Sequence, residues 1–272
     1  MPHFRRPLLF FALIAILSLG PGCAGTQTVN VDIAAIPKQD ALDASRLEES
    51  LGEVGYYYLL LNYKLVDQPQ QFHRLDRLGA RISHYSERPQ LKYRYTIIDS
   101  QFHLAYSFPP ANIVFSTAML DALKTDEKIS AVMAHEIAHI NHKHGTYFYE
   151  QKYGNKPENA SGEKVLSIAT QLGYNRAFEL QSDQTAMRYL KRSGLDPNHF
   201  IDALLMLADI EKKDEALTQK LVQNIKTRSR KIDKYSELSY PHLETRIVNC
   251  RNLLDEIKSN EKVLYKPEDF KF

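Results

Sequence analysis

The feature that most constrains this 272-residue chain is the pentapeptide HEIAH at residues 135–139, which follows the His-Glu-x-x-His pattern. Apolar residues surround it at helical spacing, from Ile129 to Ile137, so we expect an apolar helix here. Side chains four residues apart lie on one face of a helix, so the imidazoles of His135 and His139 can converge on one metal ion. Without a metal, a buried helix with these polar groups would carry a large desolvation cost.

Glu136 is rotated by about 100° from His135 around the helix axis, at the edge of the face that the two histidines share. From there its carboxylate can reach a water on the metal without binding the metal itself. Zn²⁺ lowers the pKa of such a water toward ~7, and a carboxylate can then remove its proton. The pattern therefore predicts one Zn²⁺ per chain, with Glu136 as the catalytic base. The alternative is a set of core histidines with satisfied hydrogen bonds, or a polar stripe that faces solvent.

A catalytic zinc ion needs a third protein ligand and one open position. His142 and His144 follow closely in sequence, but as a continuation of the same helix they rotate away from the metal-binding face. Their position favours a polar helix end, where cations are stabilised. A carboxylate from another helix is the other solution. The downstream candidates are Glu150, Glu158, Glu163 and Glu179.

Glu179 lies within a predicted helix, and Asp183 is four residues later on the same face. Asp183 can accept a hydrogen bond from the N–H of a metal-binding imidazole. Arg176, one turn before Glu179, can orient a carboxylate. Spacing alone leaves Glu179 open between a metal ligand and an exposed helical glutamate.

The first 22 residues have the pattern of an export signal. Two arginines precede an almost wholly apolar run from Leu8 to Leu19, which is shorter than the roughly 20 residues of a spanning helix. Small residues and then Cys23 follow, an order that resembles a bacterial lipoprotein signal. We therefore expect residues 1–22 to be a signal peptide and Cys23 to carry the lipid that attaches the protein to a membrane. An ordinary secretory signal or an uncleaved anchor is the alternative.

The rest of the chain predicts a tether over 23–40 and one domain over 41–272. No second run of 18 apolar residues occurs. Alternating and aromatic stretches predict three short strands at 91–99, 102–108 and 112–117. Helical spacing or composition predicts helices at 41–65, 70–85, 125–144, 163–192, 198–210, 212–228 and 243–258. Thr125 is the expected N-cap of the helix with the histidines. The fold class is therefore α+β, mostly helical, with a small three-stranded sheet.

The formal charges nearly cancel, with 35 Lys and Arg against 33 Asp and Glu. The chain has no polybasic character, so we expect no nucleic-acid partner. Two cysteines exclude a disulfide-rich scaffold. Lipidation of Cys23 leaves Cys250 without an intramolecular partner, so we expect Cys250 to be a buried free thiol, with intermolecular pairing as the alternative.

Three blocks of the sequence resemble the HtpX/CAAX-prenyl-protease family of zinc metallopeptidases over much of residues 90–250. These are SFPPANIVFSTAMLDAL, DEKISAVMAHEIAHINHKH and RAFELQSDQTAMRYL, the last resembling the family's Arg-x-x-Glu-x-Glu-Ala-Asp block. The resemblance implies a zincin-like domain with Glu179 as the third zinc ligand. It also implies that Asp183 is the acid that accepts a hydrogen bond from a zinc-binding imidazole. Gln181 and Ser182 stand where the family usually has Glu and Ala.

A fourth block, SYPHLETRI, resembles the family's C-terminal His-Pro…Arg-Ile block. Tyr240 stands in place of the usual His, and Arg246 matches the Arg. Tyr240, the neighbouring His242 and Arg246 are the candidates for stabilising an oxyanion in the transition state. The alternative is that these residues have no catalytic role and only pack a helix that begins at a proline.

The resemblance is to the soluble periplasmic lipoprotein branch of this family, the BepA-like and LoiP-like proteins. It implies a zinc-dependent endopeptidase that cleaves unfolded or misassembled envelope proteins in the periplasm, anchored by lipid to the outer membrane. We expect the strand at 112–117 to pair with an extended substrate. A chaperone or assembly factor for outer-membrane proteins, with little or no turnover, is the rival hypothesis. A purely structural zinc is the third, and it is disfavoured because structural sites favour four protein ligands.

Overall fold

The computed structural model describes residues 44–171, 176–210 and 243–259. The predicted signal peptide and tether, Cys23, the predicted helix at 212–228, Tyr240 and His242 all lie outside these ranges. Within them, no helix is both long enough and apolar enough to cross a membrane.

The described elements, in chain order, are α1 (Arg46–Asn62), α2 (Pro69–Ser83), β1 (Arg94–Ile98), β2 (Ala105–Phe108), β3 (Asn112–Ser116), α3 (Thr117–Leu123), α4 (Asp126–Asn141), α5 (His144–Tyr153), a 3₁₀ turn (Pro157–Asn159), α6 (Gly162–Gln171), α7 (Arg176–Arg192) and α9 (Leu243–Ser259). Residues 198–210 are helical as well. The structure confirms the α+β, mostly helical class and the three-stranded sheet.

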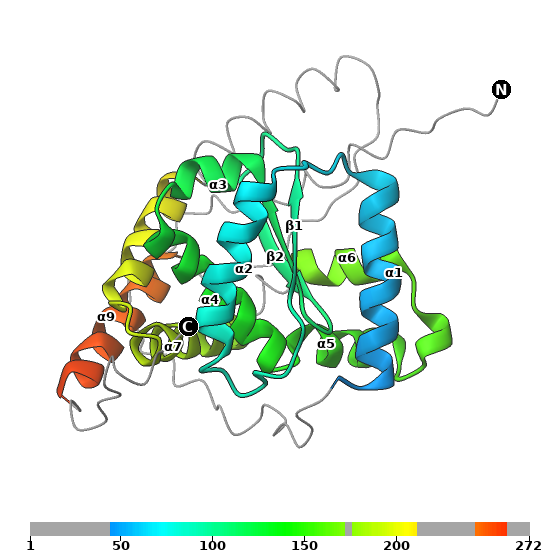
Figure 1. Cartoon of the computed structure of the whole chain (residues 1–272). Coiled ribbons are helices and arrows are strands. Elements are labelled where there is room, and N and C mark those ends of the chain that lie inside the picture. Colours follow the sequence, from blue (N-terminus) through cyan, green and yellow to red (C-terminus); the bar gives the residue numbers. More distant parts are fainter. Residues whose placement is uncertain (1–43, 172–175, 211–242, 260–272) are drawn as a thin grey trace, which may run out of the picture.

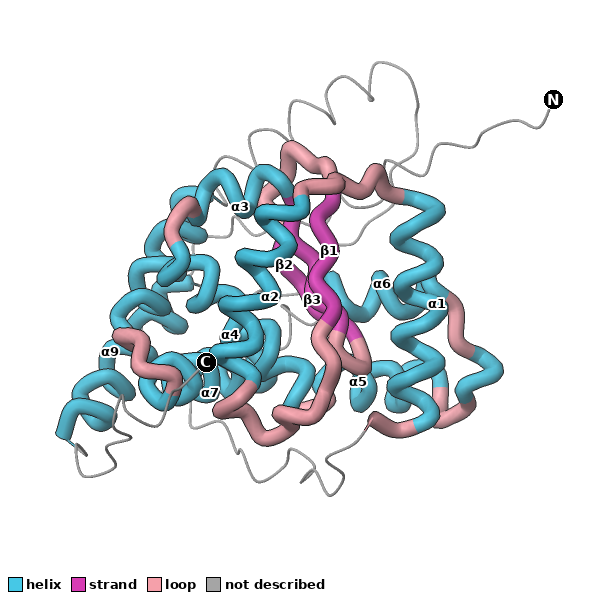
Figure 2. The backbone as a smooth tube through the Cα atoms, viewed as in Figure 1, coloured by secondary structure: helices cyan, strands magenta, loops and turns pink. Residues whose placement is uncertain are grey.

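The small sheet separates two groups of helices. Side chains alternate between its faces, so Ile97, Ile113 and Phe115 join one hydrophobic cluster, while Ile98 and Val114 join the other. One cluster includes α2, α4, α7 and α9, and the other includes α1, α5 and α6. Figure 1 shows α1 and α6 on one side of the strands and α2, α4 and α9 on the other, and Figure 2 shows the strands as one layer between them.

The strand order is β1-β3-β2, with β1 parallel and β2 antiparallel to β3. The prediction that the strand at 112–117 pairs with a substrate is therefore wrong, because β3 is the central strand and is hydrogen-bonded on both edges. Strand β2 is at the edge of the sheet, and its residues 106–108 are buried. The outer edge of β1 carries a further bridge between Leu65 and Ile98.

Helix α4, which carries the HEIAH segment, lies between the sheet and the neighbouring helices, in contact with α2, α7 and β2. Thr125 is its N-cap, as predicted, and the Thr125 hydroxyl accepts a hydrogen bond from the backbone N–H of Lys128. Every residue from Ile129 to Asn141 is buried. The polar side chains of this helix therefore need partners inside the protein.

The chain turns sharply where α4 ends. The predicted helix through residue 144 is wrong, because α4 ends at Asn141 and Lys143 adopts a left-handed conformation (φ 54°, ψ 29°). A residue in this conformation breaks the helical hydrogen-bond ladder. A new helix, α5, begins at His144. His144 is fully buried, so the predicted polar helix end is also wrong for this residue.

The stretch predicted as one helix over 163–192 is described as two helices. Helix α6 packs against α1, α5 and β2, whereas α7 packs against α2, α4 and α9. Residues 172–175 between them lie outside the described ranges. Helix α9 carries Cys250, which is buried and free as predicted, and burial raises the pKa of its thiol.

A buried ion pair connects α1 to the C-terminal end of α4. Arg88 and Glu48 are both almost completely buried, with Nη1 of Arg88 2.8 Å from Oε1 of Glu48. The same Nη1 donates to the carbonyl of Ile140, 3.3 Å away. Glu48 also completes the capping box of α1 by accepting from the backbone N–H of Ser45. Sequence spacing gave no sign of this pair, because its partners are 40 residues apart.

We expect Glu48→Gln to lower the free energy of unfolding by about 3–5 kcal/mol, because the buried Arg88 guanidinium would lose the carboxylate of Glu48. The measurement is urea denaturation at neutral pH. The matched control is Asp99→Asn, which removes the exposed ion pair to Lys64 (2.6 Å) and is expected to change the midpoint far less. Equal shifts for both variants would contradict the structural role of the buried pair.

Candidate metal centre and active site

Three predicted site residues meet where α4 packs against α7. His135 and His139 project from one face of α4, and Glu179 faces them from the first turn of α7. The two Nε2 atoms are 2.9 Å apart. Oε2 of Glu179 is 3.4 Å from Nε2 of His135, and Oε1 is 3.2 Å from Nε2 of His139. All three side chains are buried.

These separations fit a zinc ion. Zn–N and Zn–O bonds of about 2.0–2.2 Å in a tetrahedron place neighbouring ligand atoms about 3.3 Å apart. Each Nε2 lies near this distance from one oxygen of Glu179, a different oxygen for each histidine. Two imidazoles and one carboxylate are a donor set that catalytic zinc sites use, and three protein ligands leave one position open. Among the described residues, this is the one group that brings three such ligand atoms together.

Glu136 is next to this group in sequence but is not part of it. Its side chain is buried on α4, between the two histidines in the chain. Glu136 is therefore not one of the three converging ligands, and its role as the base stays a prediction.

The other predicted candidates for a third ligand lie elsewhere. Glu150 is in α5, Glu158 in the 3₁₀ turn and Glu163 in α6, and none of them joins the metal group. His142 also lies outside the metal group, and its Nε2 is within hydrogen-bond distance of the Thr185 hydroxyl, at 2.8 Å. Of the residues that spacing left open, Glu179 alone converges with the two histidines.

The charges around the group favour a cation between the histidines and the carboxylates. Burial alone would lower the pKa of His135, but Glu179 and Asp183 outweigh burial and raise this pKa to about 10. Burial would raise the pKa of Glu179, yet Arg246 and His135 hold it well below its usual value. A metal ion would replace the proton that these carboxylates otherwise favour on His135.

Asp183 lies behind His135, as predicted. Its Oδ1 is 3.0 Å from Nδ1 of His135, a hydrogen-bond distance, although the ring N–H does not point along the line between the two atoms. An acceptor at this nitrogen leaves Nε2 free for a metal. The other nitrogen of His135, Nε2, is the one that faces Glu179.

Arg246 of α9 holds both carboxylates of α7. Its Nε and Nη2 donate to Asp183 at 2.8 and 2.5 Å, and its Nη1 is 2.9 Å from Oε2 of Glu179. We predicted Arg246 as an oxyanion stabiliser, but the structure engages its guanidinium with these two acids. It fills the orienting role predicted for Arg176, whose side chain lies outside the described residues. Sequence reasoning missed this contact because it spans 63 residues.

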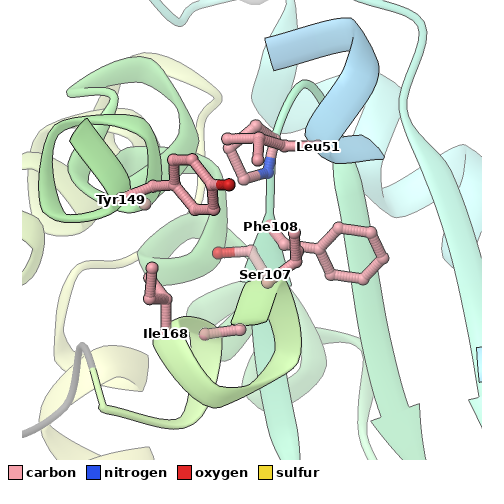
Figure 3. Close-up of a pocket in the computed structure, with 9 residues that line it drawn as sticks. Leu51, Ser107, Phe108, Tyr149 and Ile168 are labelled. Carbon is pink, nitrogen blue, oxygen red and sulfur yellow. The ribbon is translucent and has the colours of Figure 1, made fainter. Parts of the chain in front are cut away.

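Two small cavities lie beside β2 and the start of α5. The first, between β2, α5 and α6, is lined by Leu51, Ser107, Phe108, Tyr149 and Ile168 among others, and the oxygens of Ser107 and Tyr149 point into it (Figure 3). The second touches His139. Neither is lined by Glu136 or Glu179, so we do not assign either cavity to a substrate.

The family model of peptidase family M48 matches residues 69–253, which contain every described residue of this site. The chain belongs to peptidase family M48. Its members are metallopeptidases, so the match confirms the metallopeptidase family that the sequence motifs predicted.

Several relatives carry the name beta-barrel assembly-enhancing protease. The protein from Escherichia coli O157:H7 is 22% identical over 242 residues, which cover 80% of this chain and 46% of that protein. The protein from Yersinia pestis is 20% identical over 279 residues, which cover 90% of this chain and 53% of that protein. The chain thus spans about half the length of the curated relatives that it matches.

We expect Arg246→Met to raise the zinc dissociation constant roughly 10–100-fold, because Glu179 and Asp183 would lose the group that orients them. The zinc dissociation constant of Arg246→Lys should lie between those of Arg246→Met and the wild type. An ammonium group keeps the positive charge, but it cannot bind both acids as a planar guanidinium does. The measurement is competition with a chromophoric chelator. Arg251→Met, on the exposed side of the same helix, is the control. Wild-type affinity in Arg246→Met would contradict this role.

Proposed function

We propose that this protein is a zinc-dependent endopeptidase. The observation that carries the proposal is the convergence of His135, His139 and Glu179, whose ligand atoms lie within 4.8 Å of one another, in a chain of peptidase family M48. These three residues hold the ion, one per chain. When bound, Zn²⁺ supplies a Lewis acid that polarises the scissile carbonyl and makes a water more acidic.

The remaining chemistry belongs to side chains of α4, α7 and α9. Glu136 removes a proton from the attacking water and later delivers it to the leaving amine nitrogen. Asp183 orients His135 through its Nδ1, and Arg246 keeps Glu179 and Asp183 ionised and in place. Tyr240 and His242 remain our candidates for stabilising the oxyanion, a role that we assign from the sequence alone.

The substrates that we propose are unfolded or misassembled proteins of the bacterial cell envelope. The printed name of the relatives refers to β-barrel assembly, and the N-terminal sequence has the order of a lipoprotein signal. We therefore place the protein in the periplasm, with residues 1–22 removed, residues 23–40 as a tether and lipid on Cys23 holding it at the outer membrane. The catalytic domain is residues 41–272.

We expect Glu136→Gln to keep its zinc while proteolysis of an unfolded polypeptide falls by at least 100-fold, because the water loses its base and the ligands are unchanged. Metal analysis and a proteolysis assay measure the two effects on the same preparation. Glu127→Gln, an exposed residue in the first turn of α4, is the matched control.

Two results would count against this assignment. Full proteolysis by the Glu136→Gln protein would exclude Glu136 as the base. Full cellular function with no proteolysis would favour the rival hypothesis, a chaperone or assembly factor for outer-membrane proteins.

We expect Cys23→Ala to move the protein from the membrane fraction to the soluble fraction, because the lipid would have no attachment site. Fractionation and labelling with a fatty-acid analogue measure this. Proteolysis by the purified variant should be unchanged, since Cys23 precedes the catalytic domain. Membrane association without label would favour an uncleaved anchor.

A further inference from the structure

His144 contacts the metal group from behind. Its side chain is fully buried at the start of α5, and its Nδ1 is 2.9 Å from Nδ1 of His139. The other nitrogen of His139, Nε2, is the one that faces His135 and Glu179. His144 therefore touches a proposed zinc ligand on the nitrogen that a metal leaves unused.

The protons of these two rings follow from this geometry. Zinc binding through Nε2 of His139 requires that the neutral ring carry its proton on Nδ1. That N–H then donates to Nδ1 of His144, so the proton of neutral His144 is on Nε2. Nε2 of His144 lies 2.8 Å from Oε1 of Gln181, which accepts it. In this arrangement Nδ1 of His139 donates, Nδ1 of His144 accepts and Nε2 of His144 donates, so each of these buried nitrogens has a partner.

The ring of His144 is also held in one plane. It stacks on Phe178, with ring centroids 4.1 Å apart and planes 7° from parallel. The Ser182 hydroxyl lies 3.4 Å from Nδ1 of His144, on the nitrogen that accepts. Phe178, Gln181 and Ser182 all belong to α7, the helix that supplies Glu179. The same helix therefore presents the third ligand and orients the acceptor of the second.

The two histidines of α4 differ in their acceptors. Nδ1 of His135 faces the carboxylate of Asp183, an anion. Nδ1 of His139 faces a neutral imidazole backed by a neutral amide. Nδ1 of His139 therefore has an uncharged acceptor where Nδ1 of His135 faces an anionic one.

We propose that His144 and Gln181 form a hydrogen-bonded relay that holds His139 in the tautomer and orientation needed to bind zinc through Nε2. Both are positioning residues, because they act on the metal only through His139. The proposal rests on the proposed zinc site. If His144 had only a packing role, the stack on Phe178 and the volume of its ring would matter, and its ring nitrogens would not.

Two substitutions of similar size separate the relay from packing. The side-chain amide of Asn reaches about as far as Nδ1 of His, and that of Gln about as far as Nε2. His144→Asn keeps an acceptor for His139 and loses the contact to Gln181, whereas His144→Gln loses the acceptor. We expect zinc to bind His144→Asn within a few-fold of the wild type, and His144→Gln roughly 10–100-fold more weakly. The zinc dissociation constant is measured on the full chain by chelator competition.

Gln181→Glu provides a test in the opposite direction. A carboxylate accepts from Nε2 of His144 more strongly than an amide does. We expect this variant to bind zinc several-fold more tightly, a gain that loss of packing cannot produce. His73→Gln is the control, because His73 is an exposed imidazole on α2, outside the metal group and the relay. Its affinity should stay within about twofold of the wild type.

Thermal unfolding in the presence of EDTA compares the metal-free proteins and identifies any variant that is destabilised as a whole. Equal zinc affinities for His144→Asn and His144→Gln, both folded, would overturn the relay, as would unchanged affinity in Gln181→Glu. Failure of the wild-type protein to bind zinc would instead overturn the proposed function. The two failures are therefore distinguishable in one set of measurements.

Discussion

The contact between α4 and α7 brings opposite charges together inside the protein, and the candidate site depends on it. Glu179 and Asp183 are buried on α7, one turn apart, and they face the histidines of α4. Two buried carboxylates so close together repel each other and lose their hydration, which is costly without compensation. Arg246 supplies that compensation from α9 with three short contacts. Three helices must therefore be packed before any one of these residues is in place.

The surrounding fold keeps α4 in position for this contact. The sheet separates the two hydrophobic clusters, and α4 lies beside it, with every residue from Ile129 to Asn141 buried. At its C-terminal end, Arg88 donates to the carbonyl of Ile140 while it pairs with Glu48 of α1. The left-handed Lys143 then turns the chain, which brings His144 back under His139. The end of the helix is thus part of the site and not a solvated terminus.

Local patterns predicted much of this arrangement. Alternation and aromatic content found all three strands, and Thr125 was found as a cap because its hydroxyl precedes two acids and an apolar run. Periodicity failed where the chain leaves a regular element. The helical pattern continues through 142–144, so nothing in it predicts that α4 ends at Asn141. The order of the strands was also beyond local pattern, because pairing between β1 and β3 is a long-range choice.

By itself the sequence predicted the pair of candidate ligands and the candidate base, because a helix of 3.6 residues per turn places His135 and His139 on one face whatever the surroundings. The lipoprotein-like N-terminus and the family blocks are likewise properties of sequence order. Spacing left Glu150, Glu158, Glu163 and Glu179 open, and the family blocks pointed to Glu179. The tertiary structure brings Glu179 alone of these four to the histidines, and it gives Arg246 two acids and His144 a place behind His139. Those partners are many residues apart or follow a break in a helix, so their distances depend on how whole helices pack and not on spacing along the chain.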